Sequence, residues 1–218
     1  LLPAVIFAGV TGDIGTVLLL VGTYLLAVIL RESVSLSLAV MASVPLAILS
    51  GLCFLIFSAT FLESLSVSFN DLLADLNKEI GQENVTTQPI TNSLTTHQLA
   101  GLLATGNAVI AVLSVMLGRY WQSILYNPGG FSGEFRGLKV PRLLALALCV
   151  VALLLLFLGS PWVVWSAVAV LPLTITGFAL IHSYAEHSGR RLGWLALMYA
   201  LWFIFDIAKW LWVGLALI

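Results

Sequence analysis

The chain has 218 residues, of which 61% are hydrophobic and only 9% charged, and its mean hydropathy is +1.09. A soluble globular domain carries about 25% charged residues, because its surface faces water. The composition therefore excludes an ordinary soluble domain and predicts a surface that faces lipid. The formal net charge of −1 argues against nucleic acid as a partner.

Apolar runs of about 20 residues predict membrane-spanning helices. Residues 1–9 are apolar but too few to cross a core of about 30 Å, so they predict a partial span, and the chain is expected to continue beyond both ends. We predict an all-α fold, in which residues 1–218 form one polytopic transmembrane domain. About six full spans are expected, at residues 14–30, 34–60, 97–119, 142–158, 162–183 and 193–215.

A long connection, residues 61–96, begins with an amphipathic pattern. Charged residues fall mostly off one stripe, and apolar residues recur on it at spacings of three and four: Leu62, Leu65, Phe69, Leu72, Leu73, Leu76 and Ile80. Residues 82–94 are polar and predict a loop, after which Thr95 and Gln98 predict a capping box. The helix is expected either to lie on the membrane surface or to cover the bundle as a lid.

A second connection, residues 119–141, mixes aromatic and charged residues, as is typical of a loop at the level of the lipid headgroups. Pro128 and Gly129 predict a type II turn within it. Basic residues then predict orientation, because cytoplasmic loops carry an excess of them. One side of the membrane receives Arg31, Arg119, Arg136, Lys139, Arg142, Arg190 and Arg191, which makes 119–141 cytoplasmic and 61–96 external.

Three residues in the predicted spans are candidate ligand-binding groups. Asp206 and Lys209 are three residues apart and share a helix face, and intramembrane charges are costly unless they are paired or solvated. Either they form a polar site in the bundle, or Lys209 extends to an interface and pairs with Asp206 there. Asn107 can donate a hydrogen bond to a neighbouring helix, and the small residues Ala100, Ala104 and Ala108 predict close helix packing.

The sequence contains no P-loop, no Gly-x-Ser-x-Gly and no His-Glu-x-x-His motif, and neither Cys53 nor Cys149 belongs to a metal-binding pattern. We therefore predict no catalytic residue, no metal site and no cofactor, and a protein that is not an enzyme.

The segment Leu117-Gly118-Arg119-Tyr120-Trp121-Gln122, followed by Leu125-Tyr126-Asn127-Pro128-Gly129-Gly130-Phe131 and Glu134-Phe135-Arg136, resembles the proteobacterial branch of the YybS-like family, bacterial membrane proteins of unknown function. The resemblance covers most of the chain, but only residues 117–136 are specific to it. It implies the bacterial cytoplasmic membrane. That family is distantly grouped with the S-components of energy-coupling-factor transporters, which implies a bundle of about six helices that binds a small solute.

These patterns favour two functions over a third, a lipid-modifying enzyme, which would need a polar cluster at one membrane interface, where the sequence offers only weak candidates. A transport subunit would have a pocket open to the external side near residues 61–80, faced by Asp206, Asn107 and either Thr174 or Thr176. A scaffold or regulator would dock a membrane protein, a second copy of the chain or lipids through its cytoplasmic loop. The loop residues concerned are Arg119, Tyr120, Trp121, Asn127, Pro128, Gly129, Gly130, Glu134 and Arg136.

Overall fold

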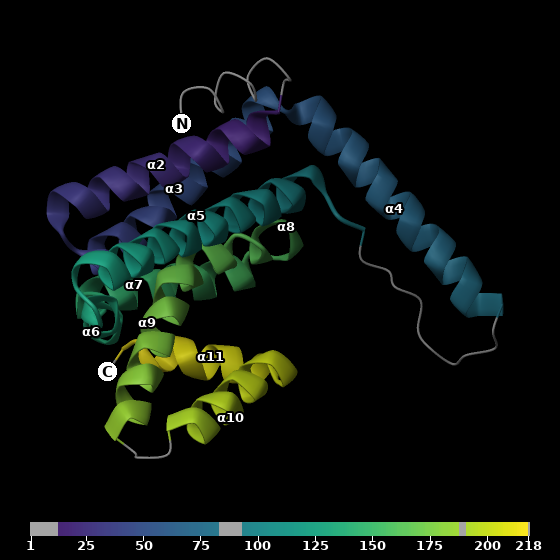
Figure 1. Cartoon of the computed structure of the whole chain (residues 1–218). Coiled ribbons are helices and arrows are strands. Elements are labelled where there is room, and N and C mark those ends of the chain that lie inside the picture. Colours follow the sequence, from purple (N-terminus) through teal and green to yellow (C-terminus); the bar gives the residue numbers. More distant parts are fainter. Residues whose placement is uncertain (1–12, 83–92, 188–190, 218) are drawn as a thin grey trace.

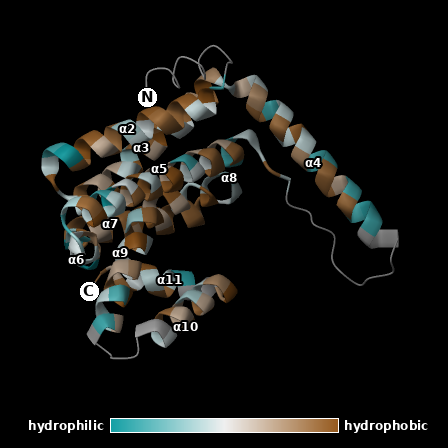
Figure 2. Ribbon diagram, in the orientation of Figure 1, coloured by the Kyte–Doolittle hydropathy of each residue, from teal (hydrophilic) through white to brown (hydrophobic). Residues whose placement is uncertain are grey.

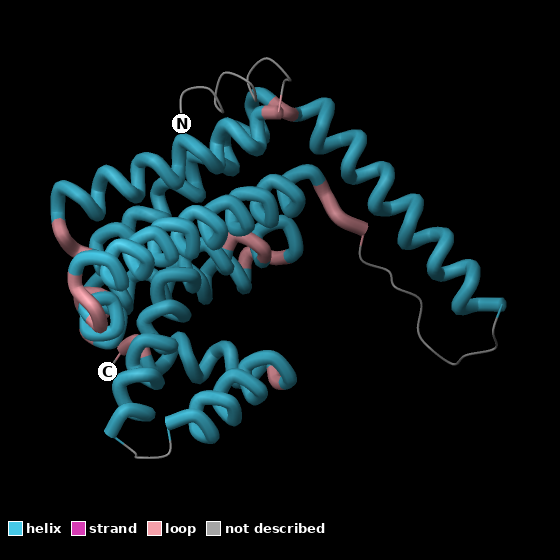
Figure 3. Tube along the Cα trace, viewed as in Figure 1, coloured by secondary structure: helices cyan, strands magenta, loops and turns pink. Residues whose placement is uncertain are grey.

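The computed structural model describes residues 13–82, 93–187 and 191–217, and every regular element in these ranges is a helix (Figures 1 and 3). The prediction of an all-α fold is confirmed for this part of the chain. The helices are α2 (Ile14–Ser33), α3 (Leu36–Phe57), α4 (Ala59–Gln82), α5 (Thr96–Tyr126), α6 (Gly130–Arg136), α7 (Arg142–Phe157), α8 (Ser160–Val163), α9 (Ser166–His187), α10 (Arg191–Ile204) and α11 (Asp206–Leu215).

The prediction of about six full spans is wrong. Among the described residues, four helical segments are long and apolar enough to cross a membrane: Ile14–Ser33, Leu36–Phe57, Thr96–Tyr126 and Ser160–Glu186. The helix α7 has 16 residues, or about 24 Å at about 1.5 Å per residue, which is less than a hydrocarbon core of about 30 Å. The predicted last span is interrupted at Phe205, whose extended backbone (φ −115°, ψ 117°) separates α10 from α11. The partial span predicted at residues 1–9 lies outside the described residues.

Close packing at small residues holds α2, α3 and α5 side by side (Figure 1). The predicted stripe on α5 is buried, with exposed fractions of 0% for Ala100, 0% for Ala104 and 6% for Ala108. Trp165, between α8 and α9, lies where α3 and α5 each carry a glycine. A Cβ atom on Gly51 would lie 2.3 Å from the Trp165 ring, and one on Gly101 would lie 3.0 Å from its Nε1 atom. The absence of side chains at these two positions makes room for the indole.

The predicted amphipathic helix is contained in α4, which extends away from the other helices and alternates polar and apolar residues along its length (Figures 1 and 2). Its first turns are attached to the bundle, where Leu62 is completely buried, whereas Leu72 is 55% exposed. The Ser66 hydroxyl donates to the Leu94 carbonyl oxygen at 2.6 Å, and the Leu94 N–H donates to Asn70 Oδ1 at 3.1 Å. These two hydrogen bonds attach the middle of α4 to the segment that leads into α5.

The predicted capping box at the start of α5 is confirmed, because the Thr95 hydroxyl accepts from the Gln98 N–H and the Gln98 side chain accepts from the Thr95 N–H. The Gln98 amide also donates to both the carbonyl and the hydroxyl oxygen of Ser160, at 2.9 Å each. The same residue therefore caps α5 and joins it to α8.

The second half of the chain packs around α9, which contacts α7, α10 and α11. Gly177 lets α11 approach closely, since a Cβ atom there would lie 2.4 Å from the Trp212 carbonyl oxygen. Pro45 lies inside α3 and Pro172 inside α9, positions that membrane helices tolerate.

Replacing Gly51 with Ala is expected to lower the free energy of unfolding by about 1–3 kcal/mol, because the new methyl group overlaps the Trp165 ring. Thermal unfolding in detergent measures the effect. Gly106→Ala on α5 is the matched control, since a Cβ atom there would have no neighbour within 4 Å. Combining Gly51→Ala with Trp165→Phe should cost less than the two single changes together, and simple additivity would contradict the proposed overlap.

Candidate functional site

An open pocket of about 480 Å³ lies where the start of α2, the end of α3 and the first half of α5 meet the beginning of α4. Its walls combine apolar side chains with a few polar ones, as ligand pockets usually do. The polar residues in its lining are Asp13, Thr16, Ser58 and Asn107. Asp13 and Thr16 come from the start of α2, Asn107 from α5, and Ser58 from the junction of α3 with α4.

Asp13 brings a negative charge to the mouth of this pocket as the N-cap of α2. Its carboxylate accepts hydrogen bonds from the Thr16 hydroxyl and, at 3.1 Å, from the Thr16 N–H. The hydroxyl bond and then the backbone bond hold the pKa of Asp13 below its usual range. Asp13 is therefore ionised at neutral pH, in a place where the positive end of the α2 dipole also favours a negative charge.

Asn107 forms part of the inner wall of the pocket. Its amide nitrogen lies 3.4 Å from the Gly15 carbonyl oxygen on α2 and 3.4 Å from the Ser50 hydroxyl on α3. The prediction that this amide bonds a neighbouring helix is confirmed. Its carbonyl oxygen is an additional acceptor in a pocket that holds few others.

A second, smaller cavity of about 20 Å³ lies deeper between α2, α3 and α5, and Asn107 lines both spaces. Ser43 and Ser50 also line the inner cavity, whose other walls are mainly Leu and Ala side chains and which is large enough for one water molecule. Further along the bundle, a cluster of buried apolar residues closes the space between the helices. It comprises Leu26, Leu36, Val40, Ala111, Val112, Val115, Leu138 and Ala179.

The other predicted ligand-binding residues do not join this pocket. Asp206 is the first residue of α11, and its side chain is outside the described part. Lys209 Nζ lies 5.7 Å from the centre of the Trp202 ring, in the α10–α11 region. Thr176 lines a different pocket, beside the segment before α7. The structure therefore does not bring Asn107, Asp206 and Thr176 together.

Asp13, Thr16 and Ser58 were not predicted as site residues. Each is a single polar residue at the end of an apolar run, and only the packing of α2 against α3 and α5 brings them together. The one available signal was Asp13 immediately before an apolar run, which is a typical N-cap position.

The prediction of a loop over residues 119–141 is wrong for most of its length. The helix α5 continues through Arg119, Tyr120 and Trp121 to Tyr126, and α6 follows after a short turn. The predicted type II turn is confirmed. Gly129 has φ 85° and ψ −10°, and the Gly130 N–H donates to the Asn127 carbonyl oxygen at 2.9 Å across Pro128.

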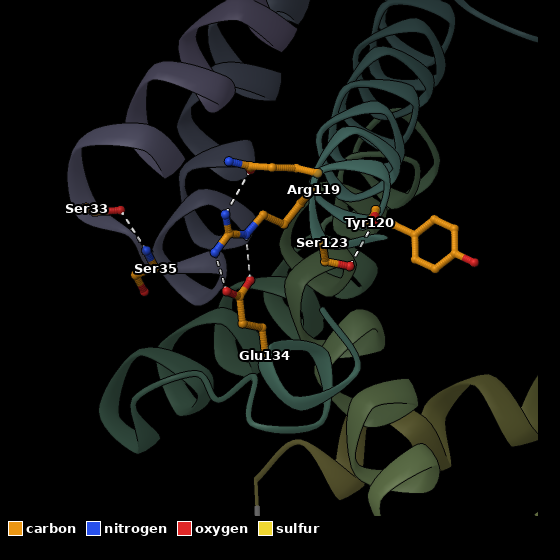
Figure 4. Close-up of polar contacts among 7 residues, drawn as sticks. Ser33, Ser35, Arg119, Tyr120, Ser123 and Glu134 are labelled. Atoms are coloured by element: carbon orange, nitrogen blue, oxygen red, sulfur yellow. Dashed lines mark hydrogen bonds and ion pairs between the residues drawn. The ribbon is translucent and has the colours of Figure 1, made fainter. Parts of the chain in front are cut away.

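Two ion pairs fix α6 between α5 and α9. Arg119 reaches from α5 to Glu134 with two parallel hydrogen bonds, of which Nε to Oε2 measures 2.8 Å, and its third nitrogen donates to Gln122 at 2.9 Å (Figure 4). Arg136, at the end of α6, pairs with Glu186 on α9. The charged residues of this segment are thus largely matched within the protein.

A continuous series of ring contacts crosses the same junction. It starts with Tyr120 and Phe131, 5.8 Å apart, and passes through Phe135 to His182 at 5.4 Å. The His182 ring then forms a hydrogen bond of 2.9 Å with the Tyr199 hydroxyl on α10. Trp121 and Tyr126 lie outside this series, and their side chains are 60% and 82% exposed.

No group of three or more His, Cys, Asp or Glu side chains in the described ranges could hold a metal ion. Comparison of the chain with protein-family models, with curated proteins and with solved structures finds no match.

Replacing Arg119 with Gln is expected to lower the free energy of unfolding by about 1 kcal/mol, because the bidentate bond to Glu134 is lost from partly exposed side chains. Denaturation in detergent measures this change. The double variant Arg119→Gln/Glu134→Gln should cost less than the two single changes together. Lys78→Gln is the control, since it removes a fully solvated ion pair with Asp75 and should have no measurable effect. Additive single effects would show that the two side chains do not interact.

Proposed function

We propose that this chain is a membrane subunit that binds a small polar solute in the pocket between α2, α3 and α5. The observation that carries the proposal is the position of Asn107, which lines both the open pocket and the inner cavity between α2, α3 and α5. The amide nitrogen of this half-buried side chain already donates to α2 and α3, whereas its carbonyl oxygen accepts no hydrogen bond from the described residues and can accept one from a solute.

The volume of the open pocket and the closed inner end of the helix bundle support binding of a solute from one side of the membrane. The volume of about 480 Å³ is within the range of about 300–1,000 Å³ that is common for small-molecule pockets. The apolar cluster around Val40 and Val112 closes the bundle beyond the inner cavity. A solute would therefore enter and leave through the mouth at Asp13, unless the helices rearrange.

The chemistry of the lining favours a neutral or cationic solute that carries hydrogen-bond donors. Asp13 contributes a carboxylate, Asn107 an amide oxygen, and Thr16 and Ser58 contribute hydroxyl groups. We place the pocket on the external side of a bacterial cytoplasmic membrane, because most basic residues lie at the other ends of the spans. The resemblance of residues 117–136 to the YybS-like family, and through it to S-components, supports the same proposal.

A thermal-shift screen of the purified chain against amino acids, polyamines, nucleosides, sugars and vitamins tests this proposal. A solute at 100 times its Kd is expected to add about 2.7 kcal/mol to the free energy of unfolding. Asn107→Leu and Thr16→Val should weaken its binding at least about tenfold, the ratio that one good hydrogen bond gives. Thr23→Val, on the same helix but remote from the pocket, is the matched control.

The pH dependence sharpens the same test. Because the Thr16 hydroxyl lowers the pKa of Asp13 below 3.8, the Asp13 charge should not change between pH 7 and pH 5, and neither should the affinity for a cationic solute. Stability from the Asp13–Thr16 contact is likewise present above pH 4 and lost only as the pH falls through the lowered pKa. A solute that binds Asn107→Leu as well as it binds the original protein, or a panel in which nothing binds, would refute the proposal.

A second candidate function is docking of a partner protein by the end of α5. The observation that favours it is the exposure of Trp121, Leu125 and Tyr126 on a segment that the Arg119–Glu134 and Arg136–Glu186 pairs hold in place. A photoreactive amino acid at position 121, activated in native membranes, should then form an adduct with a protein. Position 113 is the control, because Leu113 is 57% exposed on the same helix within the span. Adducts with lipid alone at both positions would refute docking.

A further inference from the structure

A pocket of about 380 Å³ lies at the start of α7, at the opposite end of the bundle from the proposed solute pocket between α2, α3 and α5. Three cationic side chains from one short segment line it: Arg136, Lys139 and Arg142. The rest of its lining is apolar except for Thr176 on α9, and includes Leu180 on α9 and three residues at the end of α11, Leu215, Ala216 and Leu217.

The backbone that carries these cations is fixed on both sides. Leu138 and Val140 are buried, with exposed fractions of 3% and 6%, so the residue between them points outward. The Lys139 N–H donates to the Ser37 hydroxyl at 3.1 Å, which fastens the segment to the start of α3. A binding site whose groups are already ordered loses little entropy when a ligand binds.

The charges in this pocket are only partly balanced within the protein. Arg136 pairs with Glu186 on α9. The ion pairs among the described residues leave Lys139 without a carboxylate partner. Arg142 adds a further positive charge at the first turn of α7, where the backbone N–H groups have no side-chain cap. The pocket therefore brings together three cationic side chains, and the Lys139 ammonium has donors that no carboxylate of the described residues accepts.

We infer that this pocket binds a phosphate group, and that this phosphate belongs to the headgroup of an anionic membrane lipid. A phosphate diester matches converging Arg and Lys donors. The apolar wall formed by Leu180, Leu215 and Leu217 is where the glycerol and the first methylene groups of an acyl chain would lie. A soluble phosphate compound would make no contact with that wall. The apolar wall therefore favours a lipid over a soluble compound as the source of the phosphate group.

Native mass spectrometry of the full chain, delipidated in detergent and titrated with phosphatidylglycerol, tests this inference. Phosphatidylglycerol should bind at least about tenfold more tightly than phosphatidylcholine, because the second lipid offsets its phosphate with a cationic choline. The double variant Lys139→Gln/Arg142→Gln should lose this preference, whereas Lys139→Arg should keep it. The matched control is Arg31→Gln, a basic residue at the same end of the bundle that does not line this pocket.

Competition with inorganic phosphate distinguishes a lipid ligand from a soluble phosphate compound. If millimolar phosphate leaves phosphatidylglycerol bound, the ligand is a lipid. If phosphate displaces it and raises the unfolding temperature of the original protein but not of the double variant, the phosphate site is supported and its ligand is a soluble phosphate compound. Equal binding of phosphatidylglycerol by the double variant, with unchanged helix content and unfolding temperature, would overturn the inference.

Discussion

In a membrane, two helices gain little free energy from covering each other's apolar side chains, since lipid tails already do so, and their association depends on how closely they pack. The structure meets this constraint on α5. Ala100, Ala104 and Ala108 form its buried face, and glycines on α3 and α5 admit the Trp165 ring between them. Gly177 has the same role on α9, where the backbone of α11 approaches. Trp165 thus attaches the second half of the chain to the first at positions that tolerate no larger side chain.

The position of the open pocket between α2, α3 and α5 follows from this packing. Asn107 is next to Ala108 on α5, so it lies at the edge of the packed face, where it reaches Gly15 on α2 and Ser50 on α3. Beyond this point the helices separate toward Asp13 and Ser58, and the pocket opens. In the other direction, branched apolar residues such as Val40 and Val112 fill the space between the helices. A single amide therefore marks the boundary between a tightly packed core and an accessible polar space.

Local patterns in the sequence predicted local features well. The capping box at Thr95, the type II turn at Pro128-Gly129, the alanine stripe and the amphipathic region of α4 depend on residues within a few positions of one another. The errors concern features set by distant contacts. Arg119 suggested a loop, but Glu134, fifteen positions further along the chain, neutralises it and lets α5 continue. Similarly, neither the break at Phe205 nor the grouping of Asp13 with Ser58 is visible in hydropathy, since both depend on which helices pack together.

The length of α5 explains why a charged residue can belong to a membrane helix. The helix has 31 residues and extends about 46 Å, well beyond a hydrocarbon core of about 30 Å. The part from Thr96 to Gly118 is about 34 Å long, which by itself is enough to cross the hydrocarbon core. A core that begins at Thr96 would therefore end at about Gly118, and Arg119 with its partner Glu134 would then lie at the level of the headgroups. Trp121 and Tyr126 occupy the remaining turns, in the zone that favours aromatic rings with a polar edge. In that position the ion pair would cost far less than it would inside the hydrocarbon core.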